Sequence, residues 1–251
     1  MSAITNVTTP ASSAPFLVET RQLVKRFGGV TAVSSVDFQL RQGEIRCLIG
    51  PNGAGKSTFF KMLSGQIPPT SGEVFFAGSS MHGEESFQIA RRGIGIKNQT
   101  PDVMNGISVW DNLWLAARAR HRGAEADEVA DTLIERLDLR GIHDRLVGEL
   151  AHGQRQWVEI ACVMATKPQL ILLDEPAAGM SDRETEKTAE LIKDLNRDAT
   201  TIIVVEHDMQ FIQRIAQRVT VFHQGAILIE DSFDAVASNP TVRDVYLGRG
   251  K

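Results

Sequence analysis

The stretch Gly50-Pro51-Asn52-Gly53-Ala54-Gly55-Lys56-Ser57 decides how this chain folds. It matches the pattern G-x-x-x-x-G-K-S, in which backbone N–H groups curl around phosphate oxygens and the lysine reaches the β- and γ-phosphates of a nucleotide. The apolar run Ile45 to Ile49 predicts a strand before it, and the apolar spacing from Lys56 to Ser64 predicts a helix after it. Chance would produce the pattern in on the order of one chain in a hundred, so we expect a phosphate-binding loop.

Different parts of this loop are expected to bind different parts of the nucleotide and its metal ion. Ser57 is expected to ligate Mg²⁺, and the helix that starts here directs its positive end at the anion. The predicted nucleotide-binding residues are Gly50, Asn52, Gly53, Ala54, Gly55, Lys56, Ser57 and Thr58.

A second acidic element follows a buried strand. Leu170 to Leu173 is a continuous apolar run, typical of a parallel strand covered on both faces, and Asp174-Glu175 follows it. A lone Asp-Glu pair is usually a solvated loop. In a chain with a phosphate loop, Asp174 can instead hold Mg²⁺ through water, which leaves Glu175 for the attacking water.

The order of predicted elements defines the fold class. Residues 16–40 alternate polar and apolar runs around Gly28-Gly29, as antiparallel strands do. After Pro168 strands and helices alternate, which favours a layered, mostly parallel sheet. The expected elements are a helix from Asp182 to Arg197, a strand from Thr201 to Val205, a helix from Asp208 to Gln217, a strand from Val219 to Phe222 and a hairpin turn from His223 to Ala226. Residues 108–139 have long helical periods, with Ser108 as an N-cap, and predict a helical lobe. We expect an α/β, P-loop (RecA-like) core with a small antiparallel β lobe and a helical lobe inserted at about 100–165.

Composition excludes several classes of protein. The chain has 251 residues, of which 42% are hydrophobic and 23% charged, as in ordinary globular chains. Its net charge of −4 argues against a dedicated nucleic-acid binder, and its mean hydropathy of −0.12 agrees with the lack of any long apolar span. Residues 1–15 read as a disordered tail, and Cys47 and Cys162 as reduced core thiols.

The segment Leu150-Ala151-His152-Gly153-Gln154 resembles the L-S-G-G-Q signature of ATP-binding cassette (ABC) ATPases. Ala151 replaces the usual serine and His152 the first glycine, so the serine contact to the γ-phosphate is absent. Other family landmarks occur in the expected order. Phe27 resembles the aromatic residue that stacks on adenine, Gln99 the glutamine before the helical lobe, and His207 the histidine after a late strand.

The resemblance implies a working unit of two ATPase subunits with ATP and Mg²⁺ between them. The phosphate loop of one subunit would face Ala151, His152, Gly153 and Gln154 of the other. Ser57, Gln99 and Asp174 would form the metal site, and Lys56, Glu175 and His207 would be the catalytic residues. The loop from Ala178 to Asp182, with Met180-Ser181 in place of the usual pair, would communicate across the dimer.

Within the family, the stretches at 150–159, 175–191 and 205–212 resemble the ATPases of branched-chain amino acid and amide importers. Gln156-Trp157 after the signature is similar to the urea-uptake type, and Val245 to Gly248 resembles that group's short ending. The resemblance implies a peripheral ATPase on the cytoplasmic face of the inner membrane. Its partners would be a same or sister ATPase chain, integral permease subunits and, indirectly, a solute-binding protein, with no nucleic acid.

Three other functions compete with this interpretation. An ABC ATPase acting on DNA would carry long coiled-coil arms, which the short span from Ser57 to Ala151 excludes. A P-loop kinase of a small molecule would need neither the signature nor Glu175. A non-hydrolysing subunit would not be expected to retain Lys56 and the acidic pair. The scattered histidines predict no zinc site, and Trp110 and Trp114, four residues apart, are expected to pack within the helical lobe.

Overall fold

The computed structural model describes residues 16–100 and 102–247, so the expected tail at 1–15 and Gly248 lie outside it. The strands are β1 (Val18–Phe27), β2 (Val30–Leu40), β3 (Ile45–Ile49), β4 (Ser71–Phe76), β5 (Ser79–Ser80), β6 (Ile94–Lys97), β7 (Leu170–Asp174), β8 (Thr201–Val205), β9 (Arg218–His223) and β10 (Ala226–Asp231). The α-helices are α1 (Lys56–Leu63), α2 (Ser86–Arg91), α3 (Val109–Arg118), α4 (Ala124–Arg136), α5 (His152–Ala165), α6 (Asp182–Arg197), α7 (Met209–Ile215), α8 (Phe233–Ser238) and α9 (Pro240–Leu247). Two short 3₁₀ turns, Arg140–Ile142 and Val147–Glu149, connect α4 to α5.

The central sheet has six strands in the order β10-β9-β3-β8-β7-β6. All neighbours are parallel except β10 and β9, which form a hairpin through the predicted turn at His223 to Ala226. Every residue of β3 and β8 is buried, because the sheet is covered on both faces. The predicted mostly parallel core is confirmed.

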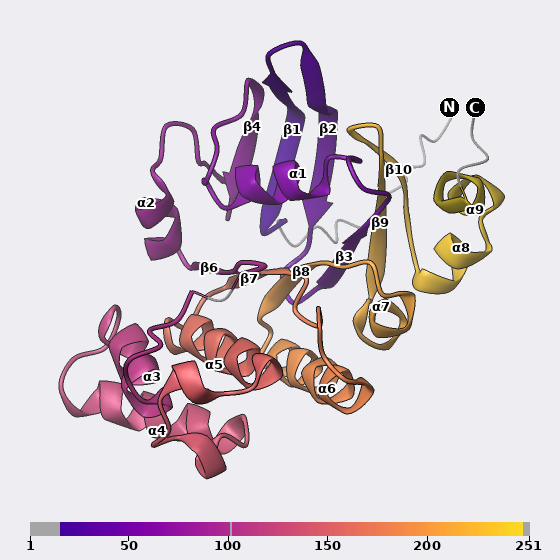
Figure 1. The fold of residues 1–251 in the computed structure, drawn as a ribbon. Coiled ribbons are helices and arrows are strands. Elements are labelled where there is room, and N and C mark those ends of the chain that lie inside the picture. The colour runs from indigo at the N-terminus through magenta and orange to yellow at the C-terminus, as the bar shows by residue number, and fades with distance from the viewer. Residues whose placement is uncertain (1–15, 101, 248–251) are drawn as a thin grey trace, which may run out of the picture.

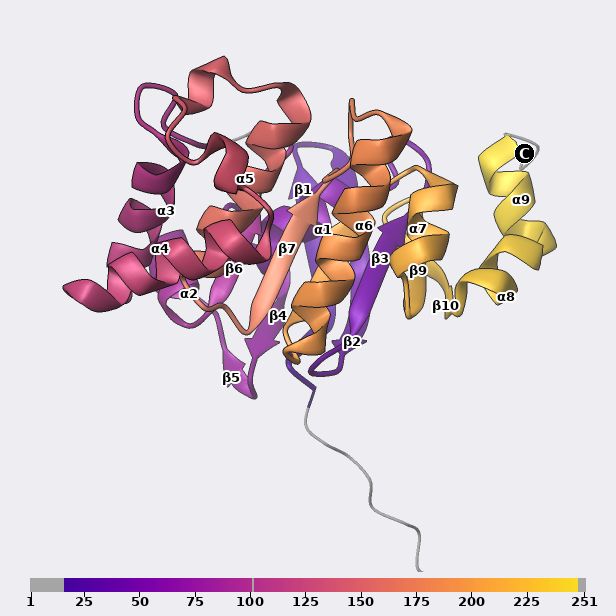
Figure 2. The ribbon, with the colours of Figure 1, turned by 90° about the horizontal axis from the view of Figure 1, so that it is seen from below.

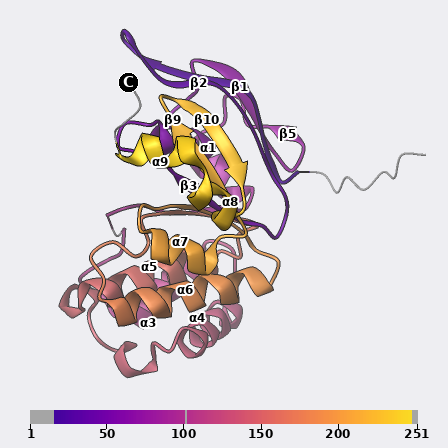
Figure 3. The ribbon, with the colours of Figure 1, turned by 90° about the vertical axis from the view of Figure 1, so that its right-hand side faces the viewer.

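Alternate residues of the central strands face two different cores. Leu48 and Leu172 pack against α1 and the antiparallel sheet, whereas Cys47 and Ile171 pack against the helices of the opposite face. Figure 1 shows α1 and the antiparallel strands above the central sheet and α5, α6 and α7 below it. Figure 3 shows the same layers from the side. The two cores together fix the position of the parallel strands and of the loops that follow their carboxyl ends.

The antiparallel lobe has the order β2-β1-β4-β5. The expected strand pair at 16–40 is confirmed as β1 and β2, joined at Gly28-Gly29. The buried Arg46 of β3 links the lobe to the central sheet, since it donates to the Gln39 carbonyl at 3.2 Å and pairs with Glu44 at 2.6 Å. The lobe is therefore fixed to the strand that precedes the phosphate loop.

A third core lies in the helical lobe, beside the sheet in Figures 1 and 2. Ser108 caps α3, as predicted, by accepting the Asp111 N–H at 3.0 Å. Trp110 and Trp114 stack and pack on this core, as expected. Helix α5 contributes to the core of the helical lobe and to a core of the central sheet, because Val158 packs in the lobe and Ile160 packs against the sheet. No helix in the described ranges is long and apolar enough to cross a membrane.

Candidate active site

Four parallel strands end at one edge of the central sheet and carry the predicted residues there. β3 leads into Gly50, β8 into His207, β7 into Glu175 and β6 into Gln99. Since the strands lie in the order β3-β8-β7-β6, segments far apart in the sequence become neighbours. The carboxyl ends of parallel strands are where α/β sheets bind ligands.

The phosphate loop needs glycine at two tight positions. Gly50 has φ +144° and Gly55 has φ +105°, conformations that side chains rarely adopt. A Cβ at Gly50 would lie 2.2 Å from the Phe222 carbonyl oxygen, and one at Gly55 would lie 2.5 Å from the Ala32 carbonyl oxygen. The loop is therefore packed against β9 on one side and β2 on the other.

The turn between β9 and β10 supports the loop from behind. The Gly225 N–H donates to the Ala54 carbonyl at 2.9 Å, and the Gly225 carbonyl accepts the Ser34 N–H at 2.8 Å. One turn thus joins the phosphate loop to β2 of the antiparallel lobe. Its sequence signalled a hairpin but not this role.

Phe27 lies at the tip of the β1–β2 hairpin, opposite Val30. Its side chain is 51% exposed, and the Lys25 ammonium lies 5.2 Å from the ring centroid. Because β2 touches the loop at Ala32 and Gly55, the same hairpin holds an exposed aromatic ring near the phosphate loop. This placement suits stacking on a flat base.

Lys56 begins α1 and lies over the loop that precedes it. Its Nζ donates to the carbonyl oxygens of Gly50 at 2.6 Å and Pro51 at 3.1 Å. Burial lowers the pKa of Lys56, and the nearby carboxylates of Glu175 and Asp174 oppose this effect. The ammonium is thus held between the phosphate loop and the acidic strand end.

The acidic pair stands at the end of β7. Burial raises the pKa of Asp174, and the neighbouring Glu175 adds to the rise. Glu175 has φ +47°, a left-handed conformation that is uncommon for a residue with a Cβ, and its N–H donates to the Val205 carbonyl at 2.9 Å. Such strained backbones cluster at functional sites.

Two predicted residues flank the carboxylate of Glu175. Gln99 Nε2 donates to Glu175 Oε2 at 2.9 Å, and His207 Nδ1 lies 3.6 Å from Glu175 Oε1. The amide and the imidazole therefore approach different oxygens of one carboxylate. The side-chain carbonyl oxygen of Gln99 takes no part in the contact with Glu175.

Two buried charged residues that belong to no recognised motif position the backbone of the site. Glu206 accepts the N–H groups of His207 at 2.8 Å and of Ala177 at 3.3 Å, so one carboxylate shapes both loops. Lys97 is fully buried and donates to the Asp174 carbonyl at 3.2 Å. The available signal was a charged residue directly at the end of an apolar strand in each case.

The signature-like segment begins α5 and lies against the loop at 177–181. Gln154 Oε1 accepts the Ala151 N–H at 3.1 Å, and His152 Nε2 lies 3.1 Å from the Ala178 carbonyl oxygen. Within the described residues, no hydrogen bond or ion pair joins residues 151–154 to the phosphate loop. The structure thus brings Phe27, the loop, the acidic pair, Gln99 and His207 together but leaves residues 151–154 apart from them.

Gly153 is buried, and its Cα faces the side chain of Glu184. A Cβ there would lie 2.5 Å from Glu184 Oε1. Glu184 itself accepts from Ser181 N at 2.9 Å and from Ser181 Oγ at 2.7 Å. A side chain at position 153 would therefore displace the Glu184 carboxylate from its contacts with Ser181 at the start of α6.

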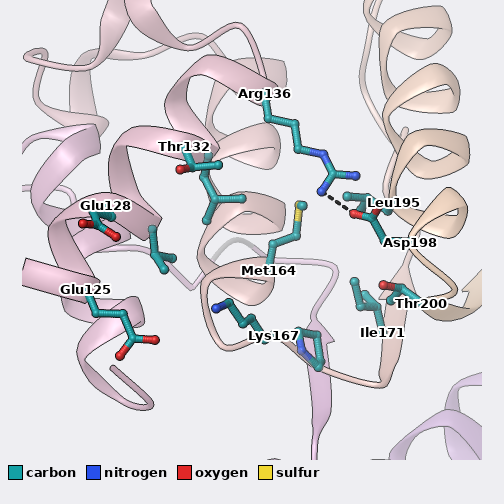
Figure 4. A pocket seen from close by; sticks show the side chains of 13 residues that line it. Glu125, Glu128, Thr132, Arg136, Met164, Lys167, Ile171, Leu195, Asp198 and Thr200 are labelled. Atoms are coloured by element: carbon teal, nitrogen blue, oxygen red, sulfur yellow. Dashed lines mark hydrogen bonds and ion pairs between the residues drawn. The ribbon is translucent and has the colours of Figure 1, made fainter. Parts of the chain in front are cut away.

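A cavity lined by α4, α5, α6 and β7 is remote from these groups. It has a volume of about 620 Å³ and opens between α4, the end of α5 and the start of β7, with Met164 and Leu195 among its apolar walls (Figure 4). Arg136 crosses it to Asp198. Because it lies at the amino end of β7, it is not part of the site described above.

Comparison with known proteins identifies the family. Residues 33–178 match the model of the ABC transporter family, and the chain belongs to that family as an ATP-binding subunit. It is 36% identical, over 92% of its length and 98% of the relative, to the High-affinity branched-chain amino acid transport ATP-binding protein LivG of Salmonella typhimurium. Its activity is ATP hydrolysis, with ATP bound together with Mg²⁺.

Solved structures share the whole architecture. MJ1267, an ATP-binding cassette of an ABC transporter, superposes with a TM-score of 0.86 at 27% identity, covering 93% of this chain and 99% of that one. A dimeric post-hydrolysis structure of the ATP-binding cassette MJ0796, bound to ADP and Pi, has a TM-score of 0.77 at 26% identity and covers 86% and 98%. The ABC ATPase fold expected from the sequence is confirmed.

Proposed function

We propose that this chain powers a membrane importer by hydrolysing ATP at the edge formed by β3, β8, β7 and β6. The observation that carries the proposal is the contact of Glu175 with both Gln99 and His207 beside the phosphate loop. Glu175 orients the attacking water, and His207 keeps that carboxylate in line. Lys56 offsets the phosphate charge once its amine leaves the carbonyls of its own loop.

The donor set fits a magnesium ion. Ser57 is an exposed hydroxyl at the start of α1, Asp174 is a carboxylate at the end of β7, and the Gln99 carbonyl oxygen is not used by Glu175. Mg²⁺ prefers such oxygen ligands and would neutralise phosphate charge when bound. A cation there would also offset the burial that raises the pKa of Asp174.

The site is completed by a second ATPase subunit, which is either a copy of this chain or a sister chain. Residues 151–154 stand at the start of a long helix and make none of their hydrogen bonds with their own phosphate loop. The N-terminus of that helix offers N–H groups and a positive dipole to the γ-phosphate of the opposing subunit. ATP would then close the dimer and hydrolysis would reopen it.

The transported solute belongs to the branched-chain amino acids, amides or urea. The similarity to LivG over nearly the full length supports the first class, and the Gln156-Trp157 pair after the signature supports urea. The subunit would sit on the cytoplasmic face of the inner membrane. Permease subunits would contact the hollow of about 400 Å³ lined by Gln99, Val103 and Arg155.

The proposal is tested by co-purifying the complex and measuring ATP hydrolysis with each solute and its binding protein. Stimulation by urea, by an amide or by leucine would identify the solute class. A chain that purifies without permease subunits, or whose hydrolysis responds to none of these solutes, would contradict the importer assignment.

A further inference from the structure

A buried carboxyl group lies behind the site, on the helix that begins with the signature-like segment. Glu159 of α5 is only 3% exposed. Its Oε1 accepts the Asp102 N–H at 3.1 Å, whereas its Oε2 has no hydrogen-bond partner among residues 16–100 and 102–247. A buried carboxyl group with one free oxygen is costly and is rarely kept without a purpose.

The charges around Glu159 act in both directions. Burial is the largest influence and raises its pKa to about 7; the N–H groups of Asp102 and Asn98 and the charge of Lys97 lower it, and the carboxylate of Asp102 raises it. On its own helix the neighbouring titratable groups are Arg155, one turn before it, and the Cys162 thiol, whose pKa burial raises to about 12. Glu159 therefore changes between its two protonation states close to neutral pH.

The contact with Asp102 joins α5 to the segment that carries Gln99. Gln99 lies three residues before Asp102 and donates to Glu175 Oε2 at 2.9 Å. Glu159 thus contacts the chain three residues beyond Gln99. No part of Glu159 contacts the phosphate loop itself in the hydrogen bonds of the described residues.

We propose that Glu159 is a positioning residue whose ionised carboxylate anchors Asp102 and thereby keeps Gln99 within hydrogen-bond distance of Glu175. A hydrogen bond to a charged acceptor is roughly twice as strong as a neutral one, so protonation of Glu159 loosens the anchor. Hydrolysis then slows as pH falls through neutrality, without loss of ATP affinity. This inference rests on the proposed role of Glu175.

The test uses the full chain and compares Glu159→Gln with Glu128→Gln, which removes an exposed carboxylate from α4. ATP affinity and kcat are measured from pH 6 to pH 8.5. Glutamine keeps an oxygen acceptor but cannot ionise, so kcat at pH 8 falls by about fivefold, in proportion to the weaker bond. In wild type kcat decreases as pH falls through neutrality, and this decrease is absent in Glu159→Gln. Glu128→Gln behaves as wild type.

A second variant keeps the proposal testable if Glu159→Gln does not fold. Asp102→Asn leaves the backbone N–H in place and removes an exposed charge that raises the pKa of Glu159, so the inflection of kcat moves to lower pH. An unchanged inflection in Asp102→Asn, or a wild-type profile in Glu159→Gln, overturns the proposal. Failure of the Glu175 assignment is separate, because it would appear as normal hydrolysis by Glu175→Gln.

Discussion

Replacing Glu159 with glutamine should stabilise the folded chain, and by more at high pH than at low pH. In the folded state burial raises the pKa of Glu159 from 4.5 to about 7. The folded chain therefore binds a proton that the unfolded chain releases between these two values. Wild-type stability falls as pH rises through this window, and the contribution of the protonated carboxyl is lost above pH 7.

The magnitude follows from the difference between the two pKa values. At about 1.36 kcal/mol per pKa unit, the ionised carboxylate costs at most ~3 kcal/mol above pH 7 relative to pH 4.5. Glutamine does not titrate and carries no such cost. The advantage of Glu159→Gln in free energy of unfolding should thus grow by up to ~3 kcal/mol from pH 4.5 to pH 7.5 and then level off.

Urea unfolding at four pH values between 4.5 and 8 measures this difference, with Glu128→Gln as the matched control for the loss of an exposed carboxylate. The control should differ from wild type by an amount that does not depend on pH in this way. A constant difference between Glu159→Gln and wild type across the range would refute the reasoning, because it would place the folded pKa of Glu159 near its ordinary value.

Three further outcomes are expected. Lys56→Ala should weaken ATP binding and abolish hydrolysis while the melting temperature stays within a few degrees, as nucleotide titration and thermal melting would show. Ala151→Ser would supply a hydroxyl to the γ-phosphate at the proposed dimer interface, a bond worth ~1.5 to 3 kcal/mol, so ATP-driven dimerisation should tighten; weaker dimerisation would contradict the proposal. Gly153→Ala should lower the urea unfolding midpoint, since its Cβ would fall 2.5 Å from Glu184 Oε1 and displace that carboxylate from the Ser181 N–H and hydroxyl; an unchanged midpoint would contradict this.

Much of the fold could be predicted because its strands and loops follow local patterns. The strand at Thr201–Val205 and the helix at Asp182–Arg197 have the predicted bounds. The late helix expected from Asp208 is shorter, because Asp208 caps it from outside and it ends at Ile215. The helices α8 and α9 were not predicted; they are short elements packed at the outer edge beyond β10 (Figure 2).

The site residues that belong to a sequence motif could be predicted, whereas the buried charged residues that position them could not. The phosphate loop and Glu175 stand in recognisable sequence patterns. Glu206, Lys97 and Glu159 act through contacts with segments distant in the sequence, and a single charged residue in an apolar context does not reveal its partner. The tight packing of Gly153 on Glu184 likewise depends on how α5 meets α6.

The central claim is that Glu175 orients the attacking water at a site closed by a second ATPase subunit. The most direct test measures ATP affinity, phosphate release and size-exclusion behaviour of the full chain and of Glu175→Gln with ATP and Mg²⁺. The account predicts that Glu175→Gln binds ATP as wild type does, releases almost no phosphate and accumulates as an ATP-bound dimer. Phosphate release by Glu175→Gln at the wild-type rate would contradict it.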